Sequence, residues 1–374
     1  MSGWAAALRA RWLTILIGAL VGAFALTVAL WGVPLGEVAT AISGADPLIL
    51  ALTGAMFLLQ QAIRAWRQAV ILRAGHPGVS LRTSLSVLCV SFFVINSLPA
   101  RLGELARPLL LAERAGVPIG GGLALMVVER IIDLCAMCAM LAALPLVVPP
   151  GVLDLRVGEV QFELHGLART AGVIGLPAAL IGLLLGLRVA APAWARLGPR
   201  LPISGRAGRI AAPIRRVGAD FAAAASAVAD PGRLAAVLGL TLLTWTTTAA
   251  MYPLLAVAFG VNDRVGLAEG FGLLGVVMAS LALPAAPGFA GTYEAFLRAG
   301  LGLFGVGGPA PTGAAGLSGD AVALAYALTM HWWVHLVQAS SAVYFLVVDR
   351  ISPRRLLDAL ARALAGDGPG DGAS

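Results

Sequence analysis

Long apolar segments, separated by shorter polar ones, run along almost the whole chain. Six of these segments have close to the roughly 20 residues that a helix needs to cross a lipid bilayer. They are residues 12–32, 47–72, 121–148, 169–190, 234–259 and 320–348. The pattern predicts an all-α polytopic membrane protein with six full transmembrane helices.

Two further apolar regions are too long for one span, and each is interrupted near its middle. Residues 83–113 are broken after Asn96, and residues 266–305 are broken after Leu283. Each break contains proline, glycine and charge, and backbone groups freed at membrane depth are tolerated only inside protein or beside a water-filled cavity. Broken segments in corresponding positions of two halves are typical of a transport site.

The composition excludes an ordinary soluble domain. Of the 374 residues, 59% are hydrophobic and 12% are charged, whereas soluble domains carry about 25% charged residues. The net charge of +7 comes from arginines beside apolar spans, which indicates a topology signal and contact with anionic lipids rather than nucleic-acid binding. We therefore expect a single transmembrane transporter-like domain over residues 1–365 and a disordered Gly-rich tail over residues 366–374.

The distribution of arginine predicts the orientation. Basic residues are concentrated in residues 64–82, in the connector 188–233 and after residue 349, whereas residues 149–168 are acidic on balance and residues 306–319 are uncharged. The basic residues of the first segment are Arg64, Arg67, Arg73 and Arg82. Placing the arginine-rich segments in the cytoplasm requires that each broken region returns to the side from which it entered.

Two re-entrant helical hairpins that enter from opposite faces follow from this placement. The repeat halves are then residues 12–148 and 169–348, with the second half inverted relative to the first, and both termini are cytoplasmic. The tripeptide Leu-Pro-Ala begins at Leu98 in the first break and again at Leu283 in the second. This match favours an inverted repeat.

The first break carries residues that suit a phosphate group. We expect a helix to restart near Gly103, so that its N-terminal amides face a cavity and favour an anion. Arg101 and Arg107 add paired guanidinium donors, and Glu104 can anchor an arginine or take a proton or a cationic headgroup. The alternative is a loop near the cytoplasmic surface whose charges are merely solvated.

The span after the first hairpin carries Glu129, Arg130 and Asp133 within an apolar helix. Glu129 and Asp133 share one face, and Arg130 can pair with Asp133 one turn on. Intramembrane charge is costly and indicates function by default; the alternative is an ion-pair network that only fixes helix packing. We expect the charged candidates to line one polar cavity near mid-membrane: Arg101, Glu104, Arg107, Glu129, Arg130, Asp133 and Glu294.

Pro284, Pro287 and Gly288 break the second region, and Thr292 is the expected N-cap of the helix that follows. Glu294 and Arg298 then lie on one face of that helix, and the alternative is a hairpin that only packs. All candidate substrate-binding and translocation residues lie in or next to the two breaks or on the charged span. They are Asn96, Pro99, Arg101, Gly103, Glu104, Arg107, Glu129, Arg130, Asp133, Pro287, Gly288, Glu294 and Arg298.

His331 and His335 share a face of the last span, but no third ligand accompanies them, so we expect packing or interfacial roles. Cys135 and Cys138 lie in an apolar segment and are expected to be structural. The sequence contains no Walker loop, no Ser–His–Asp arrangement and no zinc-ligand spacing. We therefore expect no cofactor, no metal and no catalytic residue.

The three charged segments together resemble a known family. They read Asn96-x-x-Pro99-x-Arg101-x-Gly103-Glu104-x-x-Arg107, then Glu129-Arg130-x-x-Asp133, then Pro284-x-x-Pro287-Gly288-x-x-Gly291-x-x-Glu294. This pattern, over about residues 10–350, is similar to the membrane domain of lysylphosphatidylglycerol synthase/flippase proteins and their stand-alone YbhN-like (UPF0104) relatives.

The resemblance implies a lipid translocator, since in the family a separate soluble domain attaches lysine to phosphatidylglycerol. We identify no such domain in this sequence and expect no aminoacyl transfer. The family also has members near hopanoid and glycolipid pathways, so the lipid stays open.

The first functional hypothesis is a flippase-like transporter that moves a phospholipid or other polar-headgroup or polyprenyl lipid between leaflets of the bacterial inner membrane. The second is a non-transporting membrane partner of a lipid-modifying enzyme. The third is a membrane-embedded transferase that uses Glu104, Glu129 or Asp133. The expected partner is an anionic or phosphate-bearing membrane lipid and not a nucleic acid, while an enzyme partner and a homo-oligomer stay open.

Overall fold

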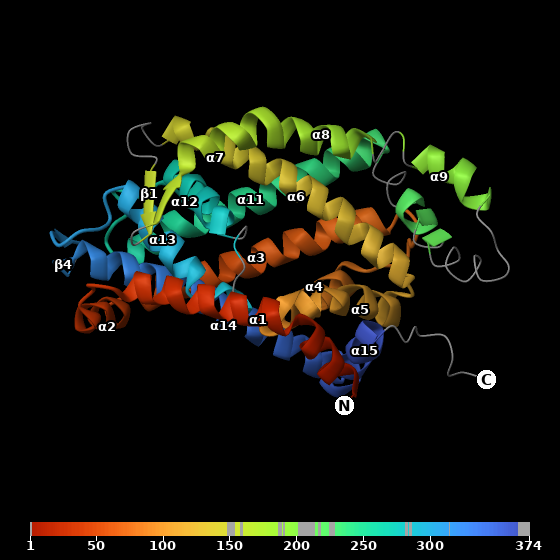
Figure 1. The fold of residues 1–374 in the computed structure, drawn as a ribbon, viewed down its shortest axis with the longest axis horizontal. Helices are drawn as coiled ribbons and strands as arrows, with labels where there is room; N and C mark the ends of the chain where they lie inside the picture. Colours follow the sequence, from red (N-terminus) through yellow and green to blue (C-terminus); the bar gives the residue numbers. More distant parts are fainter. Residues whose placement is uncertain are drawn as a thin grey trace.

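The computed structural model is mostly helical, with long helices that run roughly along one axis (Figure 1). It describes residues 2–147, 154–157, 160–185, 189, 191–200, 214–215, 218–223, 229–280, 283, 286–313 and 315–365. The expected tail at 366–374, Pro284 and much of the connector 188–233 lie outside these residues.

The first half is helical throughout. Its elements are α1 (Ser2–Leu30), α2 (Leu35–Ser43), α3 (Pro47–Leu72), α4 (Leu81–Ser97), the 3-10 helix η1 (Pro99–Leu105), α5 (Ala106–Ala115) and α6 (Ile119–Val147). Side-chain caps start two of them, since Asp46 accepts from the Leu48 amide and Ser80 accepts from the Thr83 amide. Gly116, with a φ of 64°, ends α5 because it tolerates the left-handed conformation.

A short antiparallel hairpin and a bent helix lead out of the first half. The hairpin pairs β1 (Asp154–Val157) with β2 (Val160–Glu163). Helices α7 (Leu164–Thr170) and α8 (Leu176–Leu185) follow, joined by a π-helical turn over Ala171–Gly175. Then come α9 (Ala191–Leu197) and η5 (Gly198–Arg200). The expectation of an all-α chain is therefore corrected by short strands between the helices.

The second half repeats the order of a long helix, a broken pair and another long helix. Its elements are α11 (Pro231–Ala258), α12 (Leu267–Ser280), the 3-10 helix η6 (Pro287–Phe289), α13 (Thr292–Leu303), the strands β3 (Pro311–Thr312) and β4 (Leu317–Ser318), α14 (Gly319–Val348) and α15 (Pro353–Ala365). Asp230 caps α11 by accepting from the Arg233 amide. Strands β3 and β4 pair antiparallel.

Several helices are long and apolar enough to cross a membrane. Within the described residues these are Trp12–Leu30, Pro47–Leu72 and Pro231–Ala258, and a fourth is obtained if α14 and α15, which are bent by 103° relative to each other, count as one broken span. Shorter apolar helices lie at Leu81–Ser97, Ala168–Gly182 and Leu267–Ser280. The chain is thus a mostly helical, multi-pass membrane protein.

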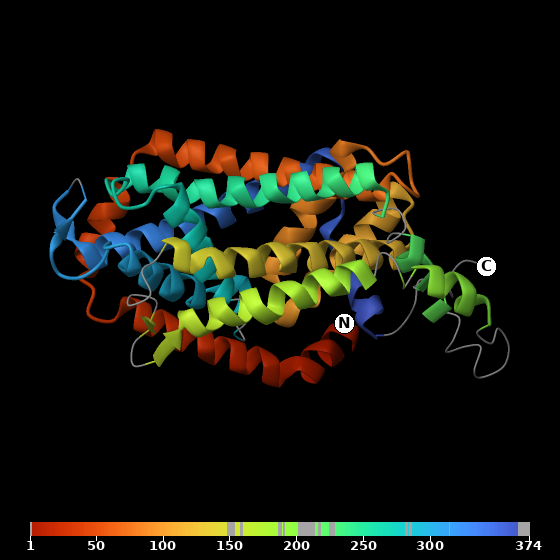
Figure 2. The same cartoon turned by 90° about the horizontal axis from the view of Figure 1, so that it is seen from above.

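The two broken regions lie toward opposite ends of the molecule. Helices α4 and α5 pack on each other, and α5 contacts α15. Figure 1 places this group toward the end that holds α15 and the N-terminus, whereas α12 and α13 pack together toward the end that holds β1 and β4. Figure 2 shows α3 and α11 side by side on one side of the molecule and α1 on the opposite side.

In the described part of the chain, two large apolar cores and one small cluster around Cys138 and Leu141 fill the interior. One is built around the second half, with residues such as Leu255, Phe296 and Leu324. The other is built around the first hairpin, with residues such as Val90 and Leu110. Helix α3 contributes to both cores, because its start lies in the first and its end in the second, so the middle of α3 lies at the boundary between them.

Small residues let the breaks approach neighbouring backbones closely. A Cβ on Gly103 would lie 2.6 Å from the Val94 carbonyl oxygen, so η1 packs directly on the end of α4. Gly22 of α1 lies equally close to the second break, because a Cβ added to Gly22 would lie 2.6 Å from the Ala286 Cβ. Helix α1 contacts both η1 and η6, so the breaks depend on glycine at these positions.

Gly103→Ala should destabilise the protein by about 1–3 kcal/mol, because the new methyl group has to displace the α4 backbone. Gly239→Ala is the matched control, since nothing lies within 4 Å of its added Cβ and alanine favours the helix. The measurement is thermal unfolding in detergent. Equal melting temperatures for the two variants would contradict the close approach.

Candidate functional site

A polar face on α3 forms the centre of the site. Gln60, Gln61, Arg64, Arg67 and Gln68 recur every three or four residues and therefore share one side of the helix. They occupy the middle of α3, at the boundary between the two apolar cores. Polar groups buried there need partners from other helices.

The glutamines at one end of this face find such partners. The Gln60 side-chain amide donates to the Thr248 hydroxyl of α11 at 3.2 Å. The Gln61 amide donates to the Gln338 side-chain oxygen of α14 at 2.8 Å, and Gln338 in turn donates to the Cys89 carbonyl of α4. These bonds connect α3 to α11, α14 and the first hairpin.

Arg67 and Asp133 form a two-pronged ion pair between α3 and α6. The two guanidinium nitrogens of Arg67 lie 2.6 and 3.0 Å from the two carboxylate oxygens of Asp133. Arg67 also donates to the Thr241 hydroxyl of α11 and lies 3.9 Å from a Glu129 oxygen. Its side chain is 3% exposed, so this is a buried charge with geometry suited to a carboxylate.

Arg107 and Glu129 extend the network to the first hairpin. One terminal nitrogen of Arg107, on α5, lies 2.7 Å from a Glu129 oxygen. Its other donors reach the Gln68 side-chain oxygen of α3 at 2.8 and 2.5 Å. The Arg107 and Glu129 side chains are 8% and 6% exposed. The hairpin is therefore held to α3 and α6 through buried charge.

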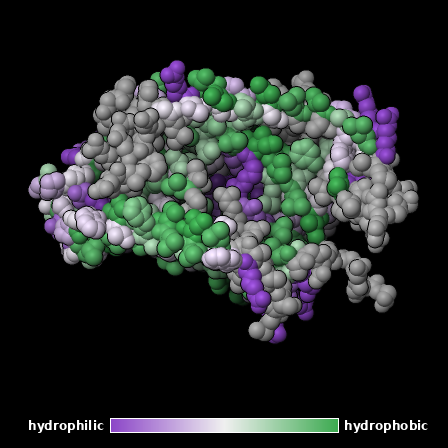
Figure 3. Space-filling view, viewed as in Figure 1, coloured by the Kyte–Doolittle hydropathy of each residue, from purple (hydrophilic) through white to green (hydrophobic). Residues whose placement is uncertain are grey.

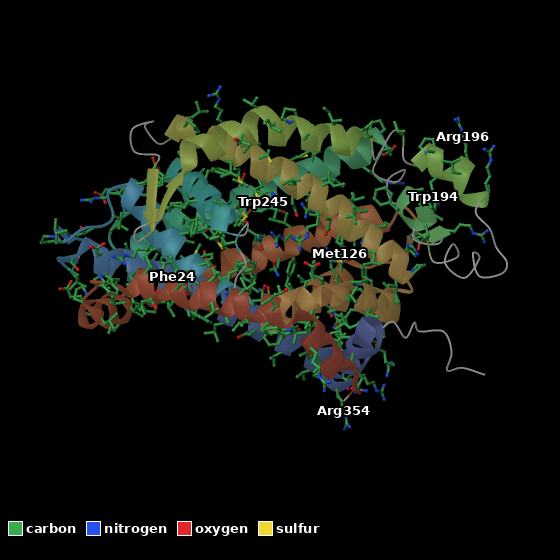
Figure 4. The ribbon with its side chains drawn as sticks, viewed as in Figure 1. Phe24, Met126, Trp194, Arg196, Trp245 and Arg354 are labelled. Carbon is green, nitrogen blue, oxygen red and sulfur yellow. The ribbon has the colours of Figure 1, made fainter. Side chains whose placement is uncertain are left out.

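Arg64 gives this network an excess of positive charge. Its guanidinium carbon lies 5.3 Å from the Phe92 ring centre and 5.9 Å from that of Trp245, a residue that Figure 4 shows in the interior. In the described part of the chain its Nε has no hydrogen-bond partner, and no carboxylate pairs with it within 4.0 Å. Three arginines thus face two carboxylates, and an anion would balance the charge.

Glu104 and Arg130 form a separate, accessible pair. Their charged atoms lie 3.8 Å apart, and the side chains are 36% and 63% exposed. Arg130 thus pairs with η1 rather than with Asp133, which corrects the sequence expectation, since Asp133 is taken by Arg67. Figure 3 shows hydrophilic atoms in a hollow of the otherwise apolar face, over the gap between α1 and α6.

The second break is held in a different way. Oε2 of Glu294 accepts from the Gly291 amide at 2.8 Å, and its Oε1 lies 2.7 Å from Nδ1 of His331 on α14. Gly291 rather than Thr292 is therefore the N-cap of α13, and the Thr292 hydroxyl donates to the Phe289 carbonyl. The Glu294 carboxylate is 1% exposed.

Arg298 lies one turn beyond Glu294 but has other partners. It lies 3.1 Å from Asp320 and donates to the Ala29 carbonyl at the end of α1 at 2.5 Å. It lines a cavity of about 840 Å³ between α1 and α13, with Phe24 and Trp31 among the apolar lining residues. This cavity combines a charged pair with apolar surface, as a lipid-binding site would.

Among the described side chains, the candidate charges are divided into three groups by their partners. Arg107, Glu129 and Asp133 lie in the buried network, Glu104 and Arg130 form the exposed pair, and Glu294 lies with His331. The Arg101 and Pro99 side chains lie outside the described atoms, although η1 includes both residues. The groups differ because Arg107 and Asp133 have buried partners on α6 and α3, whereas the Glu104–Arg130 pair is exposed and Glu294 pairs with α14.

The backbone of the breaks also differs from expectation. The regular helix restarts at Ala106, after a 3-10 segment, rather than near Gly103. The two breaks nevertheless meet, since the Asn96 carbonyl lies 3.7 Å from the position of a Cβ on Gly288. Pro287 is exposed at this meeting point.

Sequence reasoning missed Arg64, Arg67 and Gln68. Arg64 and Arg67 were counted as cytoplasmic loop charges, and that interpretation is wrong because both lie within α3. A usable signal was present, namely polar residues at helical spacing inside an apolar span. His331 was expected to have a packing or interfacial role, and the structure places it in direct contact with Glu294.

A second ion cluster lies at the end of α14. Asp349, after α14, receives a hydrogen bond from Arg82 at 2.5 Å and one from Ser86 at 2.5 Å, and lies 3.5 Å from Arg114. Burial alone would raise the pKa of Asp349, but the Ser86 and Arg82 hydrogen bonds and the nearby arginine charges lower it overall. The cluster fastens both ends of the first hairpin to the α14 terminus.

In the described residues no group of three or more His, Cys, Asp or Glu side chains is arranged to hold a metal. The cysteines at 89, 135 and 138 are free thiols.

The region of this chain that matches known proteins includes both breaks. A family model described as "Lysylphosphatidylglycerol synthase TM region" matches residues 15–330. The chain is also 26% identical over 309 residues to the protein named Glycosyltransferase AglD from Haloferax volcanii, and the match covers 76% of this chain and 48% of that protein. The chain therefore spans about half the length of the curated relative it matches.

Arg107→Ala should cost about 3–5 kcal/mol of stability, because it leaves the buried Glu129 carboxylate without its closest cation. Arg130→Ala should cost about 1 kcal/mol or less, because its pair with Glu104 is exposed. Unfolding of both variants in detergent measures the difference. Similar losses in the two variants would show that the network around Arg107 is not buried as described.

Proposed function

Because the chain belongs to the family of the lysylphosphatidylglycerol synthase transmembrane region, we propose that it moves a lipid between the leaflets of a bacterial inner membrane. The substrate is an anionic, phosphate-bearing lipid whose headgroup enters at the hollow between α1 and α6. No catalytic residue is assigned in this proposal, and the chain acts as a transporter rather than an enzyme.

The excess charge at Arg64 is the observation that carries the proposal. Arg67 is neutralised by Asp133, and Arg107 by Glu129, while Arg64 keeps its charge without a carboxylate partner among the described residues. A lone charge at membrane depth costs at least about 2.5 kcal/mol. A phosphate that binds beside Arg64 removes that cost, so the site favours an anionic headgroup over a neutral one.

The mouth of the site is suited to transient contact. Glu104 and Arg130 are partly exposed and paired at a long distance of 3.8 Å, so their interaction is weak and a headgroup can replace it. The headgroup then travels along polar side chains while the acyl chains stay against the exposed apolar faces. The cavity at Arg298 supplies a second charged and apolar surface toward the other end of the molecule.

The topology that we propose has six full spans and two re-entrant hairpins related as an inverted repeat, with both termini in the cytoplasm. It is supported by the packing of α4 on α5 and of α12 on α13 toward opposite ends of the molecule. The contact between the two breaks near Gly288 then lies where a substrate site at a repeat interface is expected.

A second candidate is a membrane partner of an enzyme that modifies lipids. It is favoured by the match to about half of a protein named as a glycosyltransferase, since the other half of such a protein can carry the chemistry. Under this hypothesis the charged network positions a lipid for the enzyme and does not move it across the bilayer.

Arg64→Gln should lower the rate of phosphatidylglycerol translocation by roughly tenfold to a hundredfold, because a charged hydrogen bond contributes about 1.5–3 kcal/mol. Its melting temperature should stay the same or rise, since an unpaired buried charge is removed. Arg64→Lys keeps the charge and should retain part of the rate. The assay is the accessibility of labelled phosphatidylglycerol to an external quencher in reconstituted vesicles.

Arg196→Gln is the matched control, because Arg196 is exposed on α9 at the far end of the molecule (Figure 4). It should translocate lipid at the wild-type rate. Wild-type protein that exposes no more lipid than empty vesicles would refute translocation and favour the partner reading. An unchanged rate in Arg64→Gln would show that the proposed site is wrong.

A further inference from the structure

A buried carboxylate–imidazole pair joins the second break to α14. Glu294 and His331 are 1% and 3% exposed and lie 2.7 Å apart. His331 is stacked on Tyr293, with the ring centres 4.4 Å apart. The translocation path proposed above does not use this pair.

The hydrogen-bond pattern requires a proton between the two side chains. Nε2 of His331 lies 2.8 Å from the Gly288 carbonyl, which can only accept, so Nε2 carries a hydrogen. Oε2 of Glu294 accepts from the Gly291 amide. The 2.7 Å contact between Nδ1 and Oε1 is then a hydrogen bond only if one further proton lies on either atom. With that proton the pair has no net charge, as imidazolium with carboxylate or as imidazole with carboxylic acid.

Loss of this proton would leave a net negative charge in a buried site. The titratable groups that face the pair are His335 of α14 and Tyr293 of α13, with Tyr252 of α11 and Tyr326 of α14 behind Tyr293. While His335 is neutral, none of these groups supplies a positive charge that would balance the loss of the proton. The nearest arginine along α13 is Arg298, which is bound to Asp320 and to the end of α1.

A base that can take up the proton lies next to the pair. His335 donates from Nδ1 to the His331 carbonyl at 2.9 Å, so its Nε2 carries a lone pair. That Nε2 is buried without a hydrogen-bond partner among the described residues and lies 3.3 Å from the position of a Cβ on Gly288. The rings of His331 and His335 meet edge to face, with centres 4.5 Å apart.

We propose that Glu294 and His331 form a proton-binding site that locks the second break against α14, and that release of this proton to His335 unlocks it. The proton leaves the Nδ1–Oε1 bridge and binds Nε2 of His335, so that the second break can separate from α14. This inference rests on the proposed lipid translocation and adds its energy source, which is a proton gradient across the membrane.

Glu294→Gln tests the site because it imitates the protonated state. The amide oxygen can still accept from Gly291, and the amide nitrogen can donate to Nδ1 of His331, so both hydrogen bonds are kept without a titrating proton. Glu113→Gln on α5 is the matched control, since Glu113 is an exposed carboxylate in the other half of the molecule.

The first measurement is the melting temperature of the full chain in detergent between about pH 5 and pH 9. Loss of the bridging proton leaves a negative charge in the buried site, so we expect the melting temperature of the wild-type protein to fall as the pH rises. Glu294→Gln should lose this fall in melting temperature, and Glu113→Gln should keep it. An equal fall with rising pH in wild type and Glu294→Gln would overturn the site.

The second measurement is lipid exposure in vesicles with an imposed pH gradient. Wild type and Glu113→Gln should respond to the gradient, and Glu294→Gln should lose the response. Lipid movement in wild type that ignores the gradient would overturn the coupling and leave translocation standing. If wild type moves no lipid under any condition, translocation and its coupling both fail, whereas the melting curves still decide whether the pair binds a proton.

Discussion

The packing of the first hairpin against α3 and α6 depends on the pairing of charge inside an apolar protein. The Arg67–Asp133 and Arg107–Glu129 pairs lie between α3, α5 and α6. A buried ion pair contributes little net stability, but removal of one partner is strongly unfavourable. The pairs therefore specify how the first hairpin sits on α3 and α6, more than they increase the total stability.

The two breaks solve the same backbone problem with different chemistry. The first break packs its glycine on α4 and is fixed by arginine–carboxylate contacts and by the Asp349 cluster at its ends. The second packs on α1 through Gly22 and is fixed by the Glu294 carboxylate, which caps α13 and reaches His331. The first break is thus held by guanidinium groups, which stay charged at any physiological pH, whereas the second is held by a carboxylate and an imidazole, which can exchange a proton.

The charge balance of the polar face connects the fold to its substrate class. Equal numbers of positive and negative charges would make this region a purely structural ion network, which is the alternative that the sequence left open. The guanidinium of Arg64, which lies near two aromatic rings and has no carboxylate partner among the described residues, departs from that balance. It gives the interior a positive potential, and membranes offer anionic headgroups to neutralise it.

The sequence by itself determined the membrane class, the helical character, the positions of both breaks and the family, which the match over residues 15–330 confirms. Hydropathy and helix-breaking residues act locally, so they are readable from one chain. It also identified Arg107, Glu129 and Asp133 as charges within apolar segments. Only the tertiary structure decided their partners, because Arg67 comes from a helix 66 positions away from Asp133 and His331 lies 37 positions from Glu294. Pairing between distant segments depends on which helix faces pack together, and no local pattern records that.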